Sequence, residues 1–215
     1  MGKIVLATII ISGSAKWLLK VGGNKEKWYG SDRIFMYVMT AFGAMTVNYS
    51  EQCTEYGWVV SNLRLLAGCL LAGGLLSAAY MDRRNCWVYN YVWWWCLPWA
   101  GILGMTAGGE FSGIVAVLVF VMLQQLLFSR MYGKADCHAF SVCALAECGN
   151  AVGMVGFLLQ MFLSVVLLTI VQLFRGNVTP RGRLREPQPF IPYIITAFFS
   201  VMFLESVFRT TYIYA

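Results

Sequence analysis

The chain has 215 residues, of which 59% are hydrophobic and only 12% are charged. Soluble domains carry about 25% charged residues, so this composition favours the lipid bilayer over water as the main solvent. The net charge is +6. In a membrane protein such an excess is typical of cytoplasmic loops, and we expect no nucleic-acid partner.

Eight apolar runs follow one another along the chain, separated by short polar segments. A membrane span needs about 20 apolar residues, so the chain has room for about eight crossings and for no separate soluble domain. We predict an all-α polytopic membrane protein, a bundle of six to eight transmembrane helices forming a single domain over residues 1–215. The runs cover residues 4–20, 34–50, 58–81, 87–107, 111–131, 137–152, 153–174 and 189–208.

The positions of the basic residues predict the orientation of these runs. If the N-terminus faces outward and every run crosses, segments 16–33, 82–86, 130–136 and 175–188 all face the cytoplasm. Of the 16 lysines and arginines, only Lys3, Arg64 and Arg209 lie elsewhere. Because basic residues accumulate on the inner side, we expect a multi-pass protein of the cytoplasmic membrane with this orientation.

Two features concern packing inside the predicted bundle. The run of small residues at 67–79, which includes Gly68, Gly73 and Gly74, predicts close contact between helices. The seven cysteines form no CxxC pair and fall mostly in apolar stretches. We expect them to be buried free thiols rather than disulfides or metal ligands.

Two of the three aspartates lie where a predicted span meets the cytoplasm. Asp82 directly follows the run 58–81, and Asp136 lies a few residues after the run 111–131. Two carboxyl groups held close together share a proton, so one can activate water while the other protonates a scissile carbonyl. The alternative is that both are solvated loop residues beside basic neighbours. Asp32 follows Ser31 and is predicted to cap a helix.

Several ordered landmarks around these aspartates resemble the type IV prepilin leader peptidases. The sequence Gly133-Lys134-Ala135-Asp136 resembles the GxGD motif of that family, and a helix of small residues follows it. Asp82 is followed by Tyr89-Asn90, where the family has Pro-Asn or Pro-Asp. Residues 189–193, Pro-Phe-Ile-Pro-Tyr, resemble the segment that opens the last family helix.

The resemblance implies an aspartic endopeptidase that removes the basic leader of a prepilin or pseudopilin at the cytoplasmic membrane face. It implies that Asp82 and Asp136 are catalytic, that Gly133 and Ala135 shape the loop, and that no metal or organic cofactor takes part. Two accessory residues are His138, where the family often has lysine, and Asn90. The alternative is a non-catalytic transporter, or a pilus or secretion assembly partner, on a degenerate peptidase scaffold.

The sequence departs from the peptidase family at one motif position and in the length of one interval. Ala135 replaces a motif glycine, which would cost about 1 kcal/mol or more if the position needs a positive φ. The interval Val21–Arg33 is short and contains no cysteine, so we expect a peptidase-only form without an N-methyltransferase domain.

Glu147 lies in the short run 137–152, where an ionisable group indicates function. It is a third accessory candidate, which either binds a basic leader or caps a polar cavity.

Overall fold

The computed structural model is helical throughout the part of the chain that it describes. Eight α-helices and no β-strand occur there, which confirms the predicted all-α class. The described residues are 2–23, 30–52, 57–108, 111–127, 129, 133–148, 153–175 and 188–213. The helices are α1 (Gly2–Val21), α2 (Gly30–Gln52), α3 (Trp58–Asn85), α4 (Asn90–Thr106), α5 (Phe111–Leu126), α6 (Lys134–Glu147), α7 (Gly153–Phe174) and α8 (Ile191–Ile213).

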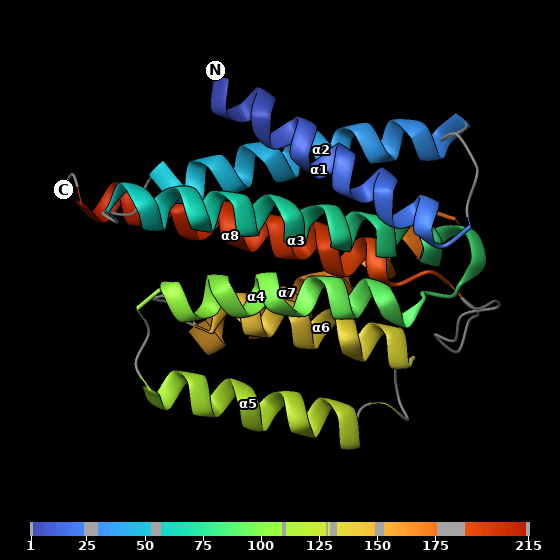
Figure 1. Ribbon diagram of the computed structural model, residues 1–215. Coiled ribbons are helices and arrows are strands. Elements are labelled where there is room, and N and C mark those ends of the chain that lie inside the picture. The colour runs from blue at the N-terminus through green and yellow to red at the C-terminus, as the bar shows by residue number, and fades with distance from the viewer. Residues whose placement is uncertain are drawn as a thin grey trace.

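The helices run back and forth along one long direction, so that consecutive helices are antiparallel (Figure 1). As a result, one end of the bundle, on the right of Figure 1, contains the last turns of α1, α3, α5 and α7. The same end contains the first turns of α2, α4, α6 and α8. Helix α3 packs against α1, α2, α4 and α8, whereas α5 lies at the edge and packs on α6 and α7. The candidate aspartates therefore lie at the same end of the bundle.

Four helices are long and apolar enough to cross a membrane, namely Gly2–Val21, Trp58–Asn85, Met154–Phe174 and Ile191–Phe208. Large apolar side chains such as Ile9 on α1 and Met122 on α5 are exposed, as suits a surface in contact with lipid. These features indicate a membrane protein. The run 137–152, expected to be a span, forms only the 14-residue helix α6 and ends at Glu147 within the described residues.

Small residues of α3 allow its neighbours to approach closely, as the sequence predicts. A Cβ atom added at Gly68 would lie 2.7 Å from Val47 Cγ1 of α2. One added at Gly73 would lie 2.9 Å from the Ile11 carbonyl oxygen of α1. Any side chain at these positions would push helices apart, so the glycines fix α3 at the centre of the bundle.

The end of α3 is marked by a cysteine in a left-handed conformation. Cys86 has φ 49° and ψ 33°, and its N–H donates to the Asp82 carbonyl oxygen at 2.8 Å. The cysteines in the described part are free thiols, all buried except Cys86, while Cys53 lies outside the described residues. The prediction of buried free thiols is therefore confirmed for five cysteines, and Cys86 is the exception.

Candidate functional site

Asp82 is buried in the last turn of α3 and is bound to the start of α8. Its side chain is only 6% exposed. The Asp82 Oδ2 atom accepts a hydrogen bond of 3.0 Å from the backbone N–H of Ile191, the first residue of α8. The N-terminus of a helix carries a partial positive charge, so this contact favours the ionised carboxylate.

Asp136 lies in the first turn of α6, a helix that is not among the four of membrane-spanning length. Its Oδ2 atom accepts a hydrogen bond of 3.2 Å from the backbone N–H of Gly133. Burial and the charge of the nearby Asp82 carboxyl raise the pKa of Asp136 to about 7, and the Gly133 N–H offsets part of that rise.

The start of α8 contacts both of the helices that carry the aspartates. Helix α8 packs on both α3 and α6, and the ring of Phe190, which directly precedes α8, contacts Phe140 of α6 in an edge-on arrangement with centroids 5.8 Å apart. Because the Asp82 charge acts on Asp136, ionising both groups at once is costly. The arrangement suits a pair of carboxyl groups that shares one proton.

The two loop residues of the candidate motif have different roles from those that a glycine motif suggests. Gly133 precedes α6 with φ −64°, and a Cβ added there would lie 3.2 Å from Asp136 Oδ2. Ala135 lies in the first helical turn, and the only described non-glycine residue with a positive φ is Cys86. The replacement of the motif glycine by Ala135 therefore causes no backbone strain.

His138 faces other neighbours than the aspartates. Its ring packs against Trp93 of α4 at 6.0 Å, and its Nδ1 atom lies 3.3 Å from Gln125 Nε2 of α5. Gln125 also donates to the Ser141 hydroxyl at 3.1 Å. Residues two apart on a helix point about 200° apart, so His138 and Asp136 lie on opposite faces of α6. Asn90 begins α4 and is exposed.

Asp32 does not act as the helix cap that its position after Ser31 predicts. It lies inside the first turn of α2. Its carboxylate forms ion pairs with Arg83 Nε at 2.8 Å and Arg84 Nε at 3.3 Å, the two residues that follow Asp82. These pairs tie α2 to the end of α3. Because they join positions about 50 residues apart, no local sequence signal could have revealed them.

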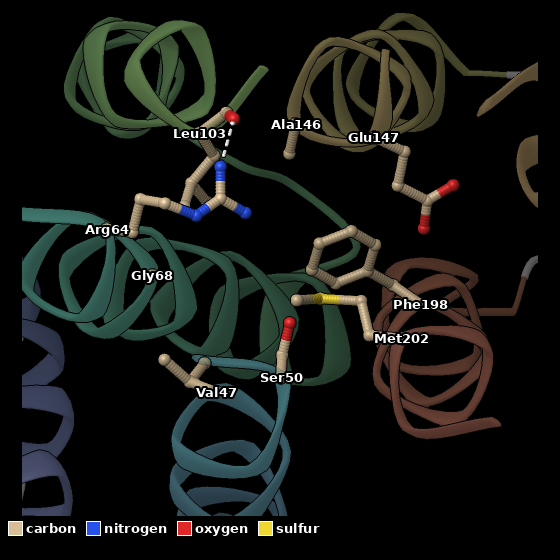
Figure 2. A pocket seen from close by; sticks show the side chains of 9 residues that line it. All are labelled: Val47, Ser50, Arg64, Gly68, Leu103, Ala146, Glu147, Phe198 and Met202. Carbon is tan, nitrogen blue, oxygen red and sulfur yellow. Dashed lines mark hydrogen bonds between the residues drawn. The ribbon is translucent and has the colours of Figure 1, made fainter. Parts of the chain in front are cut away.

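Glu147 lies far from the aspartates. It is the last residue of α6, eleven positions after Asp136, which corresponds to about 16 Å along a helix axis. There it lines a narrow cavity together with Arg64 of α3 (Figure 2). Of the two roles expected for Glu147, closure of a polar cavity fits this position, whereas contact with a leader bound at the aspartates does not.

The chain has no match among protein-family models, curated proteins or solved structures. Within the described residues, no group of three or more histidine, cysteine, aspartate or glutamate side chains could hold a metal ion.

Proposed function

We propose that this protein is an aspartic endopeptidase of the cytoplasmic membrane that removes the leader of prepilin-like or pseudopilin-like substrates. The observation that carries the proposal is the position of Asp136, whose pKa is raised by burial and by the adjacent Asp82 carboxyl. The ordered motifs that resemble the prepilin peptidase family support the choice of substrate.

The contacts of the two carboxyl groups support different roles for them in cleavage. The Ile191 N–H favours ionised Asp82, which takes a proton from the attacking water. Asp136 holds the shared proton and gives it to the oxygen of the scissile carbonyl, so a tetrahedral intermediate forms. On collapse of that intermediate, the proton on Asp82 passes to the leaving amine and the peptide bond breaks. A hydroxyl of the intermediate returns its proton to Asp136 as the carboxyl product forms, so the pair again holds a single proton.

In this proposal the chain crosses the membrane six to eight times, and the bundle holds the two carboxyl groups at the inner membrane surface. Basic side chains stand around the end of the bundle that holds the aspartates, among them Lys20 at the end of α1, Arg84 at the end of α3 and Lys134 at the start of α6. The inside-positive distribution of basic residues supports a cytoplasmic location for this end.

Co-expression with a candidate prepilin tests the proposal, since removal of the leader changes the mobility of the substrate on a gel. We expect Asp82→Asn and Asp136→Asn each to abolish the change, because asparagine can neither activate water nor donate the carboxyl proton. Asp32→Asn is the matched control at the same end of the bundle. Its partly exposed ion pairs contribute about 0–1 kcal/mol, so most activity should remain. Near wild-type cleavage by either variant of the pair would refute the catalytic assignment.

A second candidate is a non-catalytic membrane transporter, or an assembly partner of a pilus or secretion system. The buried Glu147 favours the transport reading, because ionisable groups inside a membrane bundle mark ion pathways. This reading takes precedence if the Asp82 and Asp136 variants leave the cellular phenotype unchanged while a Glu147 variant abolishes it.

A further inference from the structure

The end of the bundle opposite the aspartates contains a buried carboxyl group without a bonding partner. Glu147 is only 3% exposed. Neither of its carboxylate oxygens has a hydrogen-bond partner among the described residues. An ionised carboxylate is strongly unfavourable in such surroundings, so this group either carries a proton or must find a counter-charge.

The available counter-charge, Arg64, is bound elsewhere. Its Nη1 atom donates to the Leu103 carbonyl oxygen at 2.9 Å and to the Thr106 hydroxyl at 3.0 Å, both at the end of α4. Figure 2 shows the guanidinium directed towards α4, while the Glu147 carboxyl lies on the far side of the Phe198 ring, between α6 and α8. The carbonyl end of a helix attracts a cation, which stabilises this arrangement of Arg64.

A narrow cavity separates the two groups. Residues from α2, α3, α4, α6 and α8 line it, and it has room for about one water molecule. Small or flexible side chains dominate its walls, and an arginine side chain is long enough to cross such a space. The cavity thus supplies a route for a proton to water, whereas passage of the Arg64 guanidinium requires flexible side chains of its wall, such as Met202, to move aside.

The other ionisable groups around Glu147 that the structure describes do not neutralise it. Glu205 of α8 acts on it as a like charge, and Cys143 of the same helix is a buried thiol. The helices α5 and α7 contain no ionisable side chain, and α4 contributes Cys96 together with Tyr91, which lies near its start at the aspartate end. The side chain of Arg209, one turn beyond Glu205, lies outside the described part.

We propose that Glu147 is the proton-binding group of a second site, and that loss of its proton to cavity water draws Arg64 across the cavity to form an ion pair. In the protonated state Arg64 binds the end of α4, as in this structure. In the deprotonated state it gives up Leu103 and Thr106 and links α3 to α6. The proposal does not depend on cleavage at Asp82 and Asp136.

Infrared spectroscopy of the protein in lipid vesicles tests this site directly. Subtraction of the Glu147→Gln spectrum from the wild-type spectrum isolates the C=O band of the protonated Glu147 carboxyl group. We expect that band at neutral pH and its loss at higher pH. Glu205→Gln should lower the pH at which half of this band is lost by about one unit, because it removes a like charge. Arg64→Gln should raise that pH by about one unit, because it removes a counter-charge. A difference spectrum with only the carboxylate band at neutral pH would overturn the proposal.

A second measurement needs no variant that might fail to fold. N,N′-dicyclohexylcarbodiimide reacts with protonated carboxyl groups in apolar surroundings, and peptide mass mapping identifies the residue modified. We expect wild-type protein in vesicles to be modified at Glu147 at neutral pH, and less so as the pH rises. Modification that is absent at every pH, or equal at every pH, contradicts a proton that Glu147 binds and releases.

Discussion

The carboxylate of Asp82 accepts a hydrogen bond of 3.0 Å from the backbone N–H of Ile191, a residue 109 positions further along the chain. This bond joins the end of the central helix α3 to the start of α8. Because Phe190 then contacts Phe140 of α6, the same junction also fixes the helix that carries Asp136. The start of α8 is thus the element on which the candidate pair depends.

Removal of the Ile191 N–H should weaken cleavage without unfolding the protein. Proline is accepted at the first position of a helix, so Ile191→Pro eliminates the donor while α8 can still form. The ionised form of Asp82 loses a favourable contact, and the acidic limb of the activity–pH curve should move upward by up to about one pH unit. Ile191→Val is the matched control, because it keeps the N–H and removes only a methylene group. Equal curves for the two variants would show that the hydrogen bond has no role.

Three features can be predicted from the sequence: the helical class, the end of the bundle at which the aspartates lie, and the close packing of α3. Each of them depends on local composition or periodicity. The sequence does not reveal the contacts of Asp32 with Arg83 and Arg84, since these join helices through tertiary packing. The extent of α6 differs from the run 137–152, because the helix begins at Lys134 and ends at Glu147, shortly before Gly149 and Asn150 in the sequence, residue types that commonly follow a helix end. His138 illustrates the same limit, because a motif position does not reveal which face of a helix a side chain occupies.

Cleavage should decline as the pH rises through about 7. The pKa of Asp136 is raised from 3.8 to about 7, so its carboxyl group remains a proton donor up to that pH and is lost as a donor above it. The stability of the folded protein should also fall as the pH rises. An unfolded chain ionises this group near pH 4, so its contribution to stability is complete below pH 4 and is lost as the pH rises to about 7. Initial rates against pH, with unfolding temperatures of wild type and Asp136→Asn, measure both effects. Rates that increase steadily from pH 6 to 9 would contradict the assignment of Asp136 as the acid.

Gly133→Ala should reduce cleavage while the protein still accumulates in the membrane. The backbone at Gly133 has φ −64°, which alanine adopts freely, but its Cβ would lie 3.2 Å from Asp136 Oδ2 and crowd that carboxylate. We expect a loss of activity of about tenfold, as displacement of a reacting group by a fraction of an ångström can cause. The comparison variant is Ala135→Gly, which restores the family motif in a helical turn. It should leave activity within about twofold, and a large gain would show that the loop needs a glycine conformation there.

Cys86→Gly should stabilise the protein slightly. Cys86 is in the left-handed conformation with φ 49°, which costs a non-glycine residue about 1 kcal/mol and costs glycine little. Cys86→Ser retains the Cβ atom and should therefore give no gain. Thermal unfolding in detergent compares the two variants, and an unfolding temperature that is equal for both would contradict the strain at this position.

Single cysteines introduced as Arg84→Cys and Lys134→Cys should be accessible only from the cytoplasm. Both residues are exposed at the end of the bundle that holds the aspartates, and most lysines and arginines of the chain fall in the segments assigned to the same side. The background must lack the native cysteines, including the exposed Cys86. In intact cells, a membrane-impermeant maleimide should leave both positions unlabelled, whereas a permeant maleimide should label both. A cysteine placed at Gly57, before α3 and at the opposite end, is the matched control and should react with the impermeant reagent. Labelling of 84 and 134 with protection of 57 would reverse the orientation and place the aspartates on the outer face, where a cytoplasmic leader could not reach them.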